Sequence, residues 1–184
     1  MDGDLSGWES ILSDVSRNSQ VIGASPYIEQ ETLINGRSTA GALIRGIDPR
    51  TEHTVSELSE LMLMGELGDL RADEWGIVLG IGLASRLGVG PGDSVTVFAL
   101  RIRTTPVGVV PQVRRFEVVG LFEAGVHEYD TALALMHFTS AQKLFRLGDG
   151  MTGIRLKFED LMIAPSVSRQ LGQSLPGFYR VRDW

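Results

Sequence analysis

The architecture of this chain is set by residues 21–49, which read VIGASPYIEQETLINGRSTAGALIRGIDP. Two runs rich in apolar and β-branched residues, Val21–Ile34 and Ser38–Ile47, flank the pair Asn35-Gly36, a strong short-range signal for a β-hairpin. Asp48-Pro49 then ends the second run, because proline cannot donate a hydrogen bond to a sheet. The sequence therefore predicts a long antiparallel hairpin as the first part of the core.

Helices and strands alternate on both sides of this hairpin. Before it, apolar residues at helical spacing predict an amphipathic helix over residues 4–17. After it, the patterns predict helices at 54–64, 82–87, 139–147 and 160–173, and strands at 75–79, 94–100, 115–123, 131–137, 152–158 and 178–183. This order predicts an α+β fold, with residues 75–123 as a compact β-rich unit inserted into the rest.

Composition excludes several classes of protein. The chain has 184 residues, of which 43% are hydrophobic and 22% charged, as in globular proteins. It has no cysteine, so disulfides and thiolate chemistry are excluded, and its net charge of −6 argues against nucleic-acid binding. The longest uncharged run, Thr131–Gln142, has 12 residues and is too short for a membrane-spanning helix. Residues 1–4 lack the features of a signal peptide, so we expect none.

The glycines at 80–85 suggest a dinucleotide-binding motif, but their context does not. Gly80-Ile81-Gly82-Leu83-Ala84-Ser85 approaches the pattern G-x-G-x-x-A after a predicted strand. The true motif opens a long helix and is followed by an acidic residue about 20 positions later. Here the helix ends by Gly88, and Leu100 and Arg101 stand where the acid would be. We therefore expect these glycines to permit a tight turn, and no nucleotide cofactor.

Other catalytic and metal motifs are weak. His127, Glu128 and Asp130 come closest to a metal cluster, but on one short loop their side chains would diverge, so we expect a solvated turn. His137 stands at a predicted strand end and is expected to be a packing residue. Neither lysine of the chain follows a glycine, so no P-loop is present, and no G-x-S-x-G nucleophile motif occurs. The sequence favours a non-enzymatic domain with no cofactor and no metal.

One loop differs from the rest of the chain. Residues 99–115, ALRIRTTPVGVVPQVRR, carry four arginines and no acid, a charge of +4 in a chain of net charge −6. A loop between paired strands usually has two to five residues, and this one has about ten to fourteen. Two interpretations stay open. The loop is an extended hairpin whose valines pack on its own sheet, or it is a protruding arm whose apolar residues enter a partner's groove beside an arginine collar.

At this loop the chain resembles a known family, the periplasmic domains of LolC/LolE-type subunits of the lipoprotein-releasing ABC transporter of Gram-negative bacteria. These belong to a wider group of ectodomains that includes MacB. The similarity covers roughly residues 15–184 and rests on the order and spacing of short runs, which are Leu43–Pro49, Ile77–Gly80, Leu83–Val89, Gly92–Val95, Phe116–Phe122, Ala141-Gln142 and Thr152–Leu156.

The resemblance implies a role for the unusual loop. In LolC-like members a hook with the pattern Thr-Pro-x-Gly-x-x-Pro recruits the soluble lipoprotein chaperone LolA, and a basic residue after it supports the contact. Residues 105–111 match that pattern, and Arg114 matches the basic residue, so the chain resembles LolC or a hooked LolF-type subunit. The expected partner-binding residues are Ile102, Arg103, Thr105, Pro106, Val107, Gly108, Val109, Val110 and Pro111 in the hook, with Arg101, Arg114 and Arg115 as a basic collar.

The resemblance also implies an organisation and a location. A porter sub-domain would comprise residues 1–70 and 126–184, and a smaller β-rich Sabre sub-domain, residues 71–125, would carry the hook. The domain would lie at the periplasmic face of the inner membrane, as part of a multi-pass subunit that contacts lipoproteins and pairs with an identical or paralogous subunit. The cytoplasmic subunit LolD would hydrolyse ATP. The alternatives are a LolE-like ectodomain that contacts lipoproteins, or a MacB- or FtsX-like ectodomain that couples to another periplasmic partner.

Overall fold

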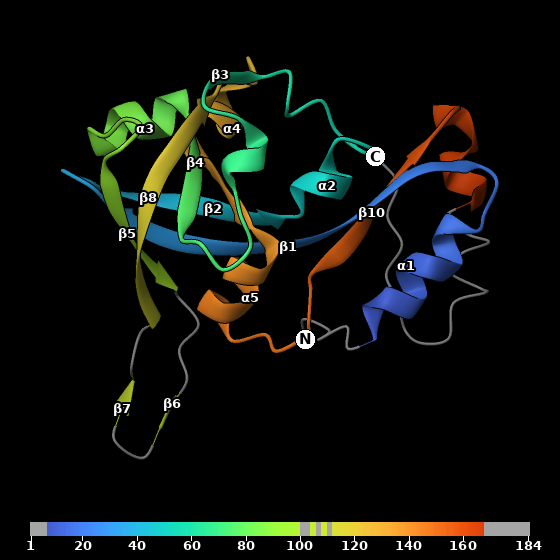
Figure 1. Ribbon diagram of the computed structural model, residues 1–184, viewed down its shortest axis with the longest axis horizontal. Coiled ribbons are helices and arrows are strands. Elements are labelled where there is room, and N and C mark those ends of the chain that lie inside the picture. The colour runs from blue at the N-terminus through green and yellow to red at the C-terminus, as the bar shows by residue number, and fades with distance from the viewer. Residues whose placement is uncertain (1–6, 100–103, 106–107, 110–111, 168–184) are drawn as a thin grey trace.

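A computed structural model describes residues 7–99, 104–105, 108–109 and 112–167 of the chain. Figure 1 shows strands gathered on one side of the molecule, with α1 and β10 on the other. The predicted strand at 178–183 and the end of the predicted helix at 160–173 lie outside the described residues.

Six strands pair in a closed ring. The neighbours run β1–β2–β9–β4–β8–β5 and return to β1, because residues 32–35 of β1 also pair with β5. The β2–β9 and β4–β8 pairs are parallel, and the others are antiparallel. The strands are β1 (Val21–Asn35), β2 (Thr39–Ile47), β4 (Gly76–Gly80), β5 (Ser94–Ala99), β8 (Gln112–Phe122) and β9 (Leu133–His137). The sheet therefore forms a small barrel with no free edge along this ring.

The main core fills the inside of this barrel. Alternation along β5 is clear, since Val95, Val97 and Ala99 are buried whereas Thr96 and Phe98 are partly exposed. The buried residues of the ring form one cluster with apolar residues of α3 (Ile81–Leu87) and α5 (Phe138–Phe145). These two helices lie at opposite ends of the barrel (Figure 1). The predicted hairpin at 21–47 and the helices at 82–87 and 139–147 are confirmed.

The predicted helix at 54–64 is wrong. Helix α2 (Pro49–Glu52) begins earlier, because Asp48 accepts a hydrogen bond from the backbone of Arg50 and Pro49 takes the first helical position. Residues 62–64 instead form strand β3 (Met62–Met64), which pairs with β8 at the edge of the sheet. The apolar residues at helical spacing belong to an irregular segment, with a short 3₁₀ helix (Leu67–Asp69), that packs on the outer side of the barrel.

A second correction concerns residues 127–132. They form a short helix, α4 (His127–Ala132), where the sequence predicted a turn followed by a strand from 131. Strand β9 therefore begins at Leu133. The sequence of residues 127–132 carries no strong helix signal. Helix α4 packs beside α3, and we attribute its formation to this contact.

The two ends of the described chain meet beyond the barrel. Strand β10 (Gly153–Phe158) pairs with residues 21–27 of β1, and α1 (Trp8–Ser16) packs against these strands. A separate small core joins Ile11 and Val15 of α1 to Val167, with Ile163 of the 3₁₀ helix Leu161–Ile163 beside them. Helix α1 confirms the amphipathic pattern, since Ile11 and Val15 are its buried residues.

The division into residues 1–70 with 126–184 and residues 71–125 stays a prediction. Each part contributes one unbroken half of the ring, with β1, β2 and β9 from the first part and β4, β8 and β5 from the second. A sub-domain boundary would therefore run through hydrogen-bonded strand pairs, β1–β5 and β4–β9.

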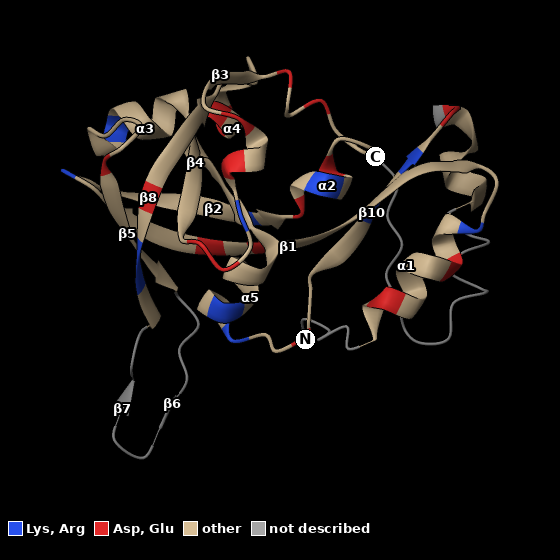
Figure 2. Ribbon diagram, viewed as in Figure 1, with Lys and Arg blue, Asp and Glu red and all other residues tan. Residues whose placement is uncertain are grey.

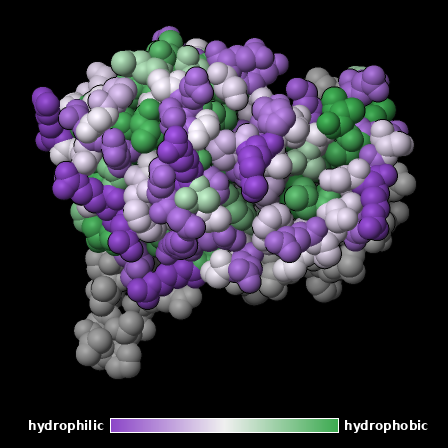
Figure 3. All heavy atoms as spheres, in the orientation of Figure 1, coloured by the Kyte–Doolittle hydropathy of each residue, from purple (hydrophilic) through white to green (hydrophobic). Residues whose placement is uncertain are grey.

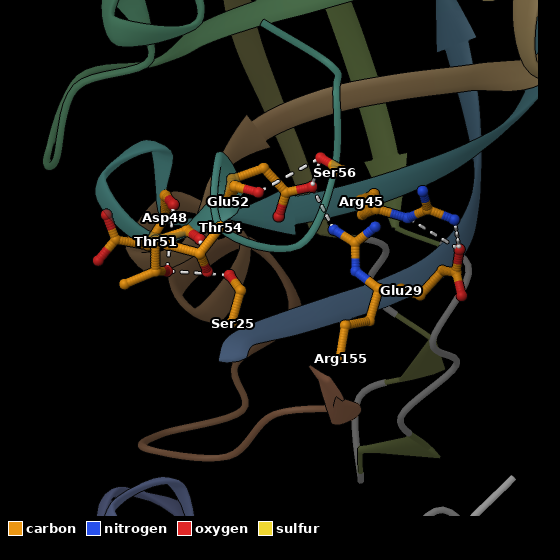
Figure 4. Close-up of polar contacts among 9 residues, drawn as sticks. All are labelled: Ser25, Glu29, Arg45, Asp48, Thr51, Glu52, Thr54, Ser56 and Arg155. Atoms are coloured by element: carbon orange, nitrogen blue, oxygen red, sulfur yellow. Dashed lines mark hydrogen bonds and ion pairs between the residues drawn. The ribbon is translucent and has the colours of Figure 1, made fainter. Parts of the chain in front are cut away.

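A polar network fixes α2 to the strands beneath it (Figure 4). Glu52 is fully buried. Its Oε1 accepts a hydrogen bond from Ser56 Oγ at 2.6 Å and forms an ion pair with Arg155 of β10. Thr51 Oγ1 and Ser25 Oγ lie 2.9 Å apart. The network ties the connection after β2 to the edge strand β10.

Candidate functional site

The unusual loop forms an arm. Strands β5 and β8 pair up to Ala99 and Gln112, and beyond them β6 (Thr104–Thr105) and β7 (Gly108–Val109) pair in a separate two-stranded sheet. In Figure 1 this ribbon lies well away from the barrel. The described backbone thus pairs as a hairpin, as one interpretation expected, and the β6–β7 pair stands apart from the main sheet, as the other expected.

Only part of the predicted site falls within the described residues. Thr105, Gly108 and Val109 lie in the ribbon, and Arg114 and Arg115 lie in β8 at the base of the arm. The other predicted residues, Arg101, Ile102, Arg103, Pro106, Val107, Val110 and Pro111, lie outside the described residues. Their role as a hook stays a prediction.

Arg114 is held at the base of the arm by aromatic rings. Its guanidinium carbon lies 4.5 Å from the ring centroid of Trp75, within the range of a cation–π contact. Trp75 in turn meets Phe116 edge to face, with centroids 5.4 Å apart. Because Phe116 is fully buried, the stack anchors an exposed arginine to the core. The side chain is therefore placed before any partner arrives.

Helix α5 holds the segment that precedes Trp75 in place. Ser140 Oγ donates a hydrogen bond to the carbonyl oxygen of Glu74, at 2.8 Å, and Lys143 pairs with Asp73. The hydrogen bond from Lys143 holds the pKa of Asp73 below its usual value. Asp73 therefore stays ionised and paired with Lys143 at neutral pH.

Arg115 points to the other face of β8. Neighbouring residues of a strand face opposite sides, so Arg115 shares the outer surface of the barrel with Val113, whereas Arg114 lies on the side of Phe116. Both arginines are exposed. The predicted collar is thus split between two faces of the strand at the base of the arm.

An apolar row crosses the outer surface beside Arg115. Leu33, Phe98 and Val113 are direct cross-strand partners on β1, β5 and β8, and Leu33 and Val113 are 40% and 46% exposed. The row continues to Gly41 of β2, where an added side chain would meet no described atom within 4 Å. Sequence reasoning missed this row, because each residue alone fits an ordinary alternating strand. Only the register brings them together.

The glycines at 80–85 serve packing. A Cβ on Gly80 would lie 2.5 Å from the carbonyl oxygen of Asp130, and one on Gly82 would lie 2.8 Å from Thr131 Cγ2. Both positions therefore let α3 approach the end of α4 closely, and this contact accounts for the G-x-G pattern. The expected tight turn is present as well, since β4 ends at Gly80 and α3 begins at Ile81.

His137 has a structural role at the start of α5. His137 is 8% exposed, which confirms the expected packing role. Its Nδ1 also accepts a hydrogen bond from the backbone of Thr139 and so caps α5, a role that the sequence did not predict. Burial lowers the pKa of His137, which favours the neutral ring that this acceptor role requires. Over the described ranges, no three His, Asp or Glu side chains gather where they could hold a metal ion.

The family follows from a comparison over nearly the whole chain. Residues 4–173 match the model of the MacB-like periplasmic core domain. The chain belongs to this family. The MacB-like fold is also seen in the periplasmic region of MacB from Actinobacillus actinomycetemcomitans, which aligns with a TM-score of 0.59 at 15% identity over 90% of this chain and 72% of that one.

Two curated relatives place this MacB-like domain within the family. It is 42% identical to "Lipoprotein-releasing system transmembrane protein LolC" of Xylella fastidiosa, over 96% of this chain and 43% of that protein. It is 24% identical to the corresponding LolE of Haemophilus influenzae, over 96% of this chain and 42% of that protein. The chain thus spans less than half the length of these relatives. Within its described residues, no helix is long and apolar enough to cross a membrane.

Proposed function

We propose that this MacB-like domain is the periplasmic part of a LolC-like transporter subunit and that its arm recruits the lipoprotein chaperone LolA. The observation that carries the proposal is the arm itself, a basic hairpin whose described tip stands apart from the barrel on a rigid base. The similarity to LolC supports the transporter assignment. The domain would lie at the outer face of the inner membrane and would not itself catalyse a reaction.

The arm suits a docking contact that must form and release. The sequence of the arm places Val107, Val109 and Val110 between two prolines, so these residues would offer apolar surface and lose little conformational freedom on binding. The stacked Arg114 offers a charge with little further ordering cost, and the row of Leu33, Phe98 and Val113 extends the apolar surface to the base. The proposal requires a complementary surface on the chaperone, an apolar groove with an acidic rim.

Recruitment has a physical purpose in lipoprotein transport. Each buried methylene of an acyl chain contributes about 0.8 kcal/mol, so a free acyl chain in water is strongly disfavoured. A chaperone held next to the transporter can receive a lipoprotein without exposing its acyl chains. ATP hydrolysis would be supplied by a cytoplasmic partner such as LolD, and a paralogous or identical subunit would complete the transporter.

Charge reversal at the base of the arm tests the electrostatic part of this proposal. In the variant Arg115→Glu, we expect the rate constant for association with LolA to fall roughly three- to ten-fold at low salt, because peripheral charges mainly steer the encounter. The dissociation rate constant should change little. Surface plasmon resonance at several salt concentrations measures both.

Arg17→Glu is the control, because Arg17 is also exposed and stands at the C-terminal cap of α1, away from the arm. It makes the same change in net charge. Equal loss of association rate in the two variants would mean that only the overall charge matters, and would contradict a role for the collar.

A further inference from the structure

A second unusual surface lies at the other end of β8. Strand β3 is the last strand in the sheet order, and over the described residues no strand pairs with its outer edge. Two of its three residues are exposed and apolar, Leu63 and Met64, each at 52%. Val126, 47% exposed, follows the part of β8 that pairs with β3. Figure 3 shows hydrophobic side chains at the surface in this region. We call Leu63, Met64 and Val126 the β3 edge.

The surroundings of the β3 edge are acidic. Residues 53–70 and 116–136 contain no lysine or arginine, and exposed acids from both segments surround the apolar residues. Figure 2 shows these acidic positions along the segment before β3 and on α4. The exposed acids of the two segments nearest to β3 and α4 in the sequence are Glu57, Glu60, Glu66, Glu123 and Glu128. Two arginines contact α4. Arg86 of α3 donates to the carbonyl oxygen of Thr131 at the far end of α4, and the guanidinium carbon of Arg45 lies 6.0 Å from the ring centroid of Tyr129. An apolar strand edge with an acidic rim suits a basic, apolar partner strand.

The arm of the same chain has this chemistry. Residues 99–115 carry four arginines, no acid and a row of valines, and the described part of their tip already forms strands. The arm and the β3 edge cannot meet within one molecule, because Gln112 and Phe122 stand at opposite ends of β8. At about 3.3 Å per residue, the two sites are roughly 30 Å apart. A second copy can bring them together.

We infer that the arm of one copy docks on the β3 edge of another, head to tail. The valines of the arm cover Leu63 and Met64, and its arginines face the acids around them. Because the two surfaces differ, the contact is heterologous, and a bound pair of copies leaves one arm and one edge free. The inference shares the arm with the proposed function but names a different partner. A neighbouring subunit would then shield the arm until the chaperone displaces it.

Mixing two defective variants tests this inference. In the first, residues 102–111 are replaced by a short Gly-Ser turn, and in the second Leu63 and Met64 are both changed to Lys. Both changes lie at exposed positions or in the arm, so the barrel is left intact, and circular dichroism checks this. Sedimentation velocity measures association at 50 mM and 500 mM salt.

We expect the wild-type domain to associate in a concentration-dependent way at 50 mM salt. Its dissociation constant should be at least ten-fold higher at 500 mM salt. Each variant alone should stay monomeric, whereas the mixture should form one-to-one pairs, since it supplies one intact arm and one intact edge. A wild-type domain that stays monomeric up to about 1 mM, or an edge variant that associates as the wild type does, would overturn the inference. Binding of LolA to the edge variant separates this outcome from failure of the proposed function, because that binding needs only the arm.

Discussion

Changing Glu52 to Ala is expected to lower the free energy of unfolding by about 3–5 kcal/mol, because it leaves the charge of Arg155 without its partner in a buried site. Glu52 is fully buried, and the side chain of Arg155 is 19% exposed. The carboxylate also accepts the hydrogen bond of Ser56, so the substitution breaks two interactions at once (Figure 4). A loss of this size is a large part of the stability of an ordinary domain. Urea unfolding followed by tryptophan fluorescence measures it.

The ion pair between Glu52 and Arg155 leaves two buried polar atoms without hydrogen bonds to the described residues. Glu52 Oε2 and Arg155 Nε are buried, and neither has a hydrogen-bond partner in the described structure. The pair is therefore incompletely satisfied, and its replacement by apolar side chains should restore stability. We expect the double variant Glu52→Leu/Arg155→Met to recover most of the loss, as buried ion pairs often do when both partners are replaced.

An exposed ion pair provides the control for this prediction. Asp14 and Arg17 lie 3.4 Å apart on the surface of α1, with both side chains more than half exposed. Asp14→Ala should leave the free energy of unfolding nearly unchanged, because water screens such pairs. If Glu52→Ala cost less than about 1 kcal/mol, the network would not fix α2 to β10 as the structure indicates.

Replacing residues 102–111 by a short Gly-Ser turn is expected to weaken binding of LolA at least 100-fold, about 2.7 kcal/mol. Contact energy in protein interfaces is concentrated in a few buried side chains, and the valines of the arm are the candidates here. Strands β5 and β8 still pair up to Ala99 and Gln112, so the turn can close without disturbing the barrel. The thermal stability of the domain should therefore stay unchanged while binding is lost.

A single substitution sharpens this second prediction. Val107→Asp places a negative charge in the arm and should reproduce most of the loss, if the arm enters an apolar groove with an acidic rim. Ile22→Asp is the control, because Ile22 is an exposed aliphatic side chain on β1, outside both the arm and the β3 edge. Biolayer interferometry with immobilised domain compares them. Full binding by the Val107→Asp variant would contradict an apolar contact at that position.

Local patterns were sufficient for those parts of the fold that depend on neighbours in the chain. The hairpin at 21–47 was predicted from a turn signal between two strand-like runs, and β1 and β2 pair from Tyr27–Ile47 to Asn35–Thr39. The helix predicted for residues 54–64 was wrong. Their apolar spacing suits a helix, but the pairing of Met62 with Phe122 makes the end of the segment a strand. Long-range contacts overrode local preference there.

The closed ring was beyond any local pattern. Strand β1 pairs with β2 along one edge, and with both β5 and β10 along the other, and nothing in residues 21–35 indicates two partners on that edge. The same limit applies to the candidate site. The arm was recognisable by its composition, since its charge and length stand out from the chain. The stack of Arg114 on Trp75 joins residues 39 positions apart and depends on the register of β4 and β8.

The central claim is that the arm recruits the chaperone, and calorimetric titration of the intact domain with LolA of the same organism tests it most directly. Run at 50 mM and 300 mM salt, the titration should show saturable one-to-one binding of moderate affinity that weakens as salt rises, because the arginines of the arm contribute to it. Absence of binding at both salt concentrations, by a domain shown to be folded, would contradict the claim. It would point to a LolE-like or MacB-like role with another partner.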